Sequence, residues 1–361
     1  MGIVLAALVP GFALTQFIVN RYRDERQSLA LEWNRRGLDA LKSSPQAAVA
    51  DFQTSLSYRD DDGSRFLLAR ALAAANRPSE AAAQLQTLAA AGPGNADVNL
   101  ELARIAAGRG DIEAAIRDYH AAIDGVWMST PLASRRNARV ELSRFLMNEG
   151  REEQAQAELI ALVADLPPDP AQLIDAGRLL AESGATARAL ALYRRALSID
   201  PSNAAASRLA GELEFRAGDM RSARADLRHA MTLGALDDGG RQLLDVSERV
   251  LALDPFVDRL SLGARARRAK RVLDAAVARL ERCRAAWEAD GRVTAKLADI
   301  EMRLTAGRFA VQTFERRPDS IDEAMAIAFD IEKLPSGACG AGTTDDRALA
   351  VIGAQHPGPS Q

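Results

Sequence analysis

Residues that carry catalytic or metal chemistry are scarce in this sequence. It contains two cysteines, Cys283 and Cys339, and three histidines, and their spacing fits neither a zinc site nor a redox motif. No glycine-rich phosphate loop follows a strand-like segment, and no nucleophile stands at a spacing that supplies it with an acid and a base. We therefore expect no enzyme activity, no metal, no cofactor and no small-molecule substrate.

The chain also lacks an excess of charge of one sign, and it has few aromatic residues. Its 46 basic and 49 acidic residues give a net charge of -3, which excludes the basic field that a nucleic-acid partner requires. Aromatic residues make up only 5% of the chain, although 48% of it is hydrophobic. This composition is too apolar for a disordered chain, and it favours an all-α fold in which small residues let helices pack closely.

Only one long hydrophobic run is present, over residues 3–19, and it is interrupted by Pro10, Thr15 and Gln16. A helix of this length spans roughly 26 Å, slightly less than the ~30 Å of a bilayer core. Extended over residues 1–20, it predicts a transmembrane anchor. A buried helix is the alternative, whereas a secretory signal is disfavoured because no basic residue precedes the run and no small-residue cleavage site follows it.

The basic residues near this run all follow it, which favours a single-pass inner (plasma) membrane protein whose body is cytoplasmic rather than periplasmic. Basic residues upstream of the sequence would reverse that orientation.

A repeated helix pair follows the run. The unit is clearest over residues 170–203, where two apolar stripes at helical spacing flank a turn at Ser183-Gly184. The small residue that opens each second helix recurs at separations of 33, 34, 40, 34 and 34, at Ala48, Ala81, Ala115, Ala155, Ala189 and Ala223. A large residue lies four positions later in every copy, at Phe52, Leu85, Tyr119, Leu159, Tyr193 and Leu227. The first helices carry their own small residue, at Gly37, Ala69, Ala103, Ser143, Gly177 and Gly211.

This pattern resembles the tetratricopeptide repeat (TPR) family over residues 29 to 236. The resemblance implies an all-α solenoid, a right-handed superhelix of six antiparallel helix pairs. We expect an anchor over residues 1–20, the array over 21–236, a helical cap over 237–335 and a flexible tail over 336–361 that holds a short helix near 345–354. The cap closes the last apolar surface, and its predicted helices cover residues 242–253, 261–288, 294–305 and 321–334.

Two features interrupt the regular pattern. The 40-residue spacing reflects an insertion, Gly125–Thr130, whose Trp127-Met128 pair we expect to pack back onto the solenoid rather than to meet a partner. The basic run from Arg265 to Arg271 could contact anionic lipid, but a solvated helix face is the simpler interpretation.

An arginine directly follows the small residue of the first helix in four consecutive repeats, at Arg70, Arg104, Arg144 and Arg178. We refer to these four residues as the arginine ladder. In the family that this chain resembles, the first helices line the concave surface where peptides or helices bind. The neighbours expected on this face are Leu100, Val140, Ile174 and Met147, which together with arginine suit an acidic, partly apolar segment. The alternative is structural, because Glu101, Glu141 and Asp175 each precede an arginine by three residues and can pair with it within the helix. Arg70 has Leu67 at that place, so it is expected to be the least neutralised.

These observations predict a membrane-anchored scaffold that binds a protein or peptide in its groove. The alternative is a dedicated assembly factor for an envelope process such as lipopolysaccharide or cytochrome c assembly, since the architecture resembles bacterial single-pass proteins of that kind. A disulfide between Cys283 and Cys339 is plausible if the body faces the periplasm, whereas both cysteines should stay reduced in the cytoplasm.

Overall fold

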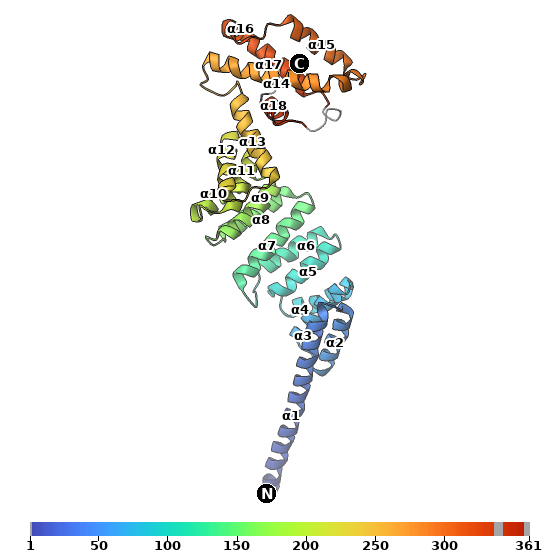
Figure 1. Ribbon diagram of the computed structural model, residues 1–361. Helices are drawn as coiled ribbons and strands as arrows, with labels where there is room; N and C mark the ends of the chain where they lie inside the picture. Colours follow the sequence, from blue (N-terminus) through green and yellow to red (C-terminus); the bar gives the residue numbers. More distant parts are fainter. Residues whose placement is uncertain (1, 336–341, 357–361) are drawn as a thin grey trace. The chain divides into compact units, whose positions relative to one another are not determined.

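The computed structural model describes the backbone of residues 2–335 and 342–356, and within this part the chain is helical throughout (Figure 1). It divides into two compact units, Met1–Asp165 and Leu166–Gln361, so the boundary falls inside the predicted 21–236 array. The first unit contains α1 Gly2–Leu41, α2 Pro45–Tyr58, α3 Asp62–Ala74, α4 Pro78–Ala91, α5 Ala96–Gly108, α6 Ile112–Asp124, α7 Pro131–Asn148 and α8 Glu152–Ala164. The second contains α9 Pro170–Glu182, α10 Thr186–Ile199, α11 Ala204–Arg216, α12 Met220–Thr232, α13 Asp238–Leu253, α14 Leu262–Glu288, α15 Thr294–Ala306, α16 Val311–Arg316, α17 Asp319–Glu332 and α18 Thr344–Gln355.

The six predicted helix pairs are present, from α1–α2 to α11–α12. All six small residues that open the second helices have no exposed surface, and the large residues four positions later are at most 4% exposed. The large residue can be buried because the small residue of the first helix leaves room for it. At Gly177 the ring of Tyr193 lies so close that an added Cβ would be 2.5 Å from its Cε1 atom. A right-handed superhelix over the whole array stays a prediction.

The turns inside the pairs follow from backbone chemistry. In four repeats a glycine with positive φ ends the first helix, at Gly110, Gly150, Gly184 and Gly218. The second repeat uses Asn76, with a φ of 59°, and asparagine tolerates the left-handed region better than most residues. Aspartate then caps two of the second helices: the side chains of Asp111 and Asp219 accept hydrogen bonds from the amides of Ala114 and Ser222.

The insertion between the third and fourth repeats packs onto the first unit, as predicted. Trp127 is 6% exposed and joins the core formed by α5, α6 and α7. The amide of Val126 donates to the carbonyl of Gly94 and its carbonyl accepts from the amide of Ala96, which holds the loop against the start of α5. Met128, however, is 84% exposed.

The prediction of a transmembrane anchor over residues 1–20 is not supported. α1 is one continuous helix of 40 residues, and its second half packs against α2, where Ser55 donates to the carbonyl of Ala30. The structure describes the side chains of Phe12 and of residues 14–335 and 342–356, and none of these belongs to a helix long and apolar enough to cross a membrane. Residues 1–11 and Ala13 of the predicted anchor lie outside those side chains.

The predicted cap is a helical body with its own core in the second unit. The four predicted cap helices are present as α13, α14, α15 and α17, and a short helix, α16, was not predicted. The core gathers side chains from α13 to α18, including the buried Trp287, whose Nε1 donates to the carbonyl of Pro335.

The predicted short helix of the tail is also present, but it is not loose. α18 buries Ala348, Leu349 and Ile352 in this core. Arg282 and Arg249 hold its first turn through Asp346 and Asp345, and Gln355 donates to the carbonyl of Gly218 at 2.8 Å. Of the predicted cysteine pair, Cys283 is buried in α14, whereas Cys339 lies outside the described residues, so their pairing stays a prediction.

Candidate interaction surface

Two members of the arginine ladder, Arg70 and Arg104, form ion pairs between repeats of the first unit. Arg104 on α5 binds Glu141 on α7 through two hydrogen bonds, with Nη2–Oε1 and Nε–Oε2 distances of 2.6 and 2.9 Å. It also contacts Glu101 on its own helix at 3.0 Å. The hydrogen bond to Glu141 raises the pKa of Arg104 above its ordinary value, so this guanidinium stays charged at any accessible pH.

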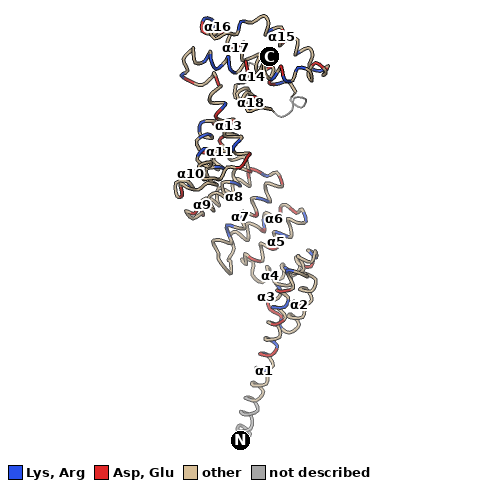
Figure 2. Tube along the Cα trace, in the orientation of Figure 1, with Lys and Arg blue, Asp and Glu red and all other residues tan. Residues whose placement is uncertain are grey.

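Arg70 extends the same chain of charges, which corrects the expectation that it is the least neutralised. Its Nε lies 3.6 Å from Oε1 of Glu101, a residue of the following repeat. The alternating sequence Arg70, Glu101, Arg104, Glu141 therefore connects α3, α5 and α7, and basic and acidic residues are interspersed along these repeats (Figure 2). Spacing within one helix predicted the contacts Glu101–Arg104, Glu141–Arg144 and Asp175–Arg178, and among the described residues only the first is formed.

The other two arginines differ from this pattern. Arg144 and Arg178 are exposed, and within the described part of the chain neither forms an ion pair. Arg70 and Arg104 each pair with an acidic residue that lies two positions before the small residue of the next first helix. In the repeat after Arg178, that position is Leu209. In that sixth repeat the ladder position itself is Glu212, which pairs with Arg208 and Arg216.

The neighbours predicted beside the ladder offer less apolar surface than expected. Leu100 and Ile174 are buried, at 9% and 6% exposure, and Val140 and Met147 are half-buried. Two buried tyrosines interact electrostatically with ladder arginines, Tyr119 with Arg104 and Tyr193 with Arg178. Burial raises the pKa of Tyr119 to about 12, with the Glu141 carboxylate adding to the shift and Arg104 opposing it. Burial likewise raises the pKa of Tyr193 to about 12, and Arg178 opposes that shift.

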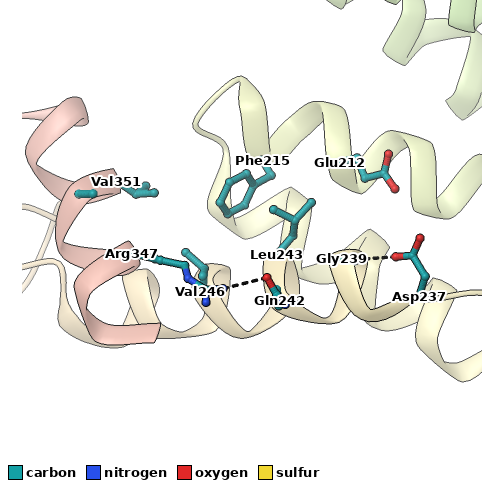
Figure 3. A pocket seen from close by; sticks show the side chains of 11 residues that line it. Glu212, Phe215, Asp237, Gly239, Gln242, Leu243, Val246, Arg347 and Val351 are labelled. Atoms are coloured by element: carbon teal, nitrogen blue, oxygen red, sulfur yellow. Dashed lines mark hydrogen bonds between the residues drawn. The ribbon is translucent and has the colours of Figure 1, made fainter. Parts of the chain in front are cut away.

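A cavity of about 560 Å³ opens on the second unit between α11, α13 and α18 (Figure 3). Its wall is apolar, with Phe215 from α11, Leu243 and Val246 from α13, and Val351 from α18. Polar groups stand at its edges: Glu212, Asp237, and Arg347, whose Nη1 donates to Oε1 of Gln242 at 2.9 Å. Sequence reasoning missed this cavity, because it exists only where α18 returns to the array from over 100 residues away.

In the basic run of α14, several side chains are paired within the protein, and contact of this face with lipid or with solvent stays a prediction. Arg265 pairs with Asp322, Arg268 donates to the carbonyl of Asp254, and Lys270 pairs with Asp274. Across the described residues, no three His, Cys, Asp or Glu side chains come together as a metal site requires.

Two family models identify the repeats. Residues 66–127 and 141–204 match a family model described as tetratricopeptide repeat, and residues 180–231 match a second model with the same description. No curated protein sequence matches the chain.

Among solved structures, the chain is similar to PilF of Pseudomonas aeruginosa, with 17% identity over 58% of this chain and 93% of that chain and a TM-score of 0.41. It is also similar to the C-terminal part of a TPR protein from Cytophaga hutchinsonii, with 12% identity, 66% and 94% coverage and a TM-score of 0.46. The TPR2AB domain of yeast Sti1, solved as a complex with pHSP90, gives 16% identity, 61% and 99% coverage and a TM-score of 0.27. All three TM-scores are below 0.5, so these likenesses support no argument about this chain.

Proposed function

Because the chain is a tetratricopeptide repeat protein, a class of protein-interaction scaffold, we propose that it binds an acidic, partly apolar segment of a protein partner on the face of its first helices. Two separate observations carry this proposal: Arg144 in the first unit and Arg178 in the second are both exposed, and neither forms an ion pair with any described residue. A free guanidinium can hold an incoming carboxylate through two parallel hydrogen bonds.

The two other ladder arginines have a different role in this proposal. Arg70 and Arg104 are already neutralised by Glu101 and Glu141, so they stabilise the contact between repeats. Partly exposed pairs of this kind contribute roughly 0.2–1 kcal/mol each. Within the second unit, the 560 Å³ cavity presents Phe215, Leu243 and Val351 as an apolar surface.

The test compares arginines with different surroundings. Binding partners are first captured with the wild-type chain from a mild detergent extract and identified by mass spectrometry. The strongest partner is then measured against Arg144→Glu, Arg178→Glu and the control Arg188→Glu, an exposed arginine on the second helix α10.

We expect Arg144→Glu and Arg178→Glu each to lower the affinity for the partner by about tenfold, since a charge-assisted hydrogen bond contributes roughly 1.5–3 kcal/mol. The control should bind with wild-type affinity. Equal binding by all four folded proteins would refute the role of these arginines.

Membrane attachment is a separate question from partner binding. A single-pass inner-membrane location with a cytoplasmic body stays a prediction, and so does the narrower role of an envelope assembly factor. Extraction with alkaline carbonate tests the location: a chain that begins at Arg21 should be soluble, and release of the full-length chain would contradict an anchor in residues 1–20.

A further inference from the structure

One core position of the solenoid carries a charge in a single repeat. The residue three positions after the small residue of the first helix is Leu72, Ala106, Leu146 and Leu180 in the second to fifth repeats, and each of these is at most 9% exposed. In the sixth repeat the same position is Glu214, and it is just as buried, at 2% exposure. A carboxylate is expensive to bury where leucine suffices, so its presence requires an explanation beyond packing.

The carboxyl group of Glu214 is only half satisfied by the protein. Its Oε1 accepts a hydrogen bond from Nη2 of Arg194, on α10, at 2.9 Å. Its Oε2 is buried and accepts no hydrogen bond from an N–H or hydroxyl group of the described residues, and the Asp226 side chain lies within hydrogen-bonding reach of the same carboxyl group. A buried carboxylate oxygen normally accepts a hydrogen bond from a donor beside it, because an oxygen that is removed from water without one carries the full cost of its desolvation.

The surroundings supply space for such a donor. Glu214 lines a cavity of about 260 Å³, together with Arg194 and Leu197 from α10 and Ser222, Ala225 and Asp226 from α12. Its lining therefore comes mainly from second helices, away from the ladder positions on the first. Burial and the nearby Asp226 side chain together raise the pKa of Glu214 to about 7, although the hydrogen bond from Arg194 opposes this shift.

We propose that this cavity binds a single primary ammonium group between Glu214, Asp226 and Ser222. The charges that face it are one guanidinium, Arg194, and two carboxylates, which leaves a net charge of one negative unit for one cation to neutralise. An ammonium group has three N–H donors and no acceptor, and the cavity offers three acceptors: Oε2 of Glu214, the carboxylate of Asp226 and the hydroxyl of Ser222. The group can belong to a free amine or to a lysine side chain of a protein partner.

The next repeat provides a matched control. Arg228 and Glu248 stand 34 residues after Arg194 and Glu214 and form the same pair between helices, with an Nε–Oε1 distance of 2.7 Å. The Glu248 side chain is 38% exposed, however, so water satisfies what the pair leaves open. Substitution at Glu248 therefore removes an equivalent carboxylate without touching the cavity.

The experiment follows the backbone amides of Ser222 and Ala225 by NMR while butylammonium is added to the full chain at pH 8 and constant ionic strength. We expect saturable shifts in the wild type and in Glu248→Gln, and binding weakened at least tenfold in Glu214→Gln. Wild-type affinity should fall between pH 8 and pH 6, because Glu214 takes up a proton and loses its charge. This pH series keeps the test valid even if a variant fails to fold.

Two probes distinguish an ammonium site from apolar binding of the butyl tail and from attraction of charge alone. Butan-1-ol has the same apolar tail without charge, and tetramethylammonium has the charge without N–H donors. A response to either that equals the response to butylammonium, or unchanged butylammonium binding by Glu214→Gln, would overturn the proposal. N-acetyl-lysine methylamide then distinguishes the source: binding at least as tight as butylammonium assigns the site to a partner's lysine, and weaker binding assigns it to a free amine. Because Arg144 and Arg178 are untouched, failure here is distinct from failure of the proposed function.

Discussion

The close approach of Tyr193 to Gly177 makes a specific prediction about the solenoid core. In Gly177→Ala, the new Cβ would meet Cε1 and Cδ1 of the Tyr193 ring at 2.5 and 2.9 Å. The ring is 1% exposed, so it cannot swing into solvent to make room. Restoring an ordinary contact requires the two helices or the ring to move by about 1 Å.

Two opposing effects set the magnitude. Overpacking a core by a methyl group typically costs about 1–3 kcal/mol. Replacing glycine with alanine inside a helix stabilises it by roughly 0.5–1 kcal/mol. We therefore expect Gly177→Ala to lower the free energy of unfolding by about 1–2 kcal/mol. Gly108→Ala, at a helix position where nothing lies within 4 Å of the new Cβ, should be neutral or slightly stabilising.

A double mutant isolates the clash. The second repeat naturally combines Ala69 with Leu85 at the equivalent positions, and both are buried. Gly177→Ala combined with Tyr193→Leu copies that combination, so it should lose less stability than the sum of the two single variants. The assay is urea unfolding followed by circular dichroism. Additive effects, or a Gly177→Ala variant as stable as Gly108→Ala, would refute the packing argument.

Three further predictions follow from other buried sites. Ala189→Glu places a charge at a position with no exposed surface and should cost at least ~3 kcal/mol in the free energy of unfolding, whereas Arg188→Glu beside it should cost little by the same urea assay. Since burial raises the pKa of Glu214 from 4.5 to about 7, the folded chain binds a proton that the unfolded chain has released, and the free energy of unfolding should fall as the pH rises from 4.5 to about 7; an identical pH dependence in Glu214→Gln would contradict this. Truncation after Gly342 removes α18 and should expose the amides of α13 to hydrogen exchange, with α2 as the unchanged reference.

The sequence predicts the repeats well because their constraint is local and periodic. A residue such as Ala115 must be small wherever two helices cross closely, and the 34-residue period repeats that requirement in every copy. The packing of Trp127 was predictable for a similar reason, since a large apolar side chain in a loop needs cover.

The candidate site was less predictable because it depends on distances between helices. Spacing identified Glu101 as a partner of Arg104 on the same helix, but the approach of Arg70 to Glu101 depends on how far α3 lies from α5. The cavity beside Phe215 depends on α18, whose place in the fold rests on contacts such as Gln355 with Gly218, 137 residues apart. No local pattern contains that information.

The alternating charges along α3, α5 and α7 make the length of this array adjustable. Arg70 reaches Glu101 in the next repeat just as Arg104 reaches Glu141. Excision of the intervening repeat as a whole would leave Arg70 facing Glu141 and preserve the alternation, whereas a cut within a repeat would bring like charges together. One additional repeat inserted between two repeats would have an opposite charge on each side. We therefore expect the removal or insertion of one whole repeat to disturb the first unit less than a cut within a repeat.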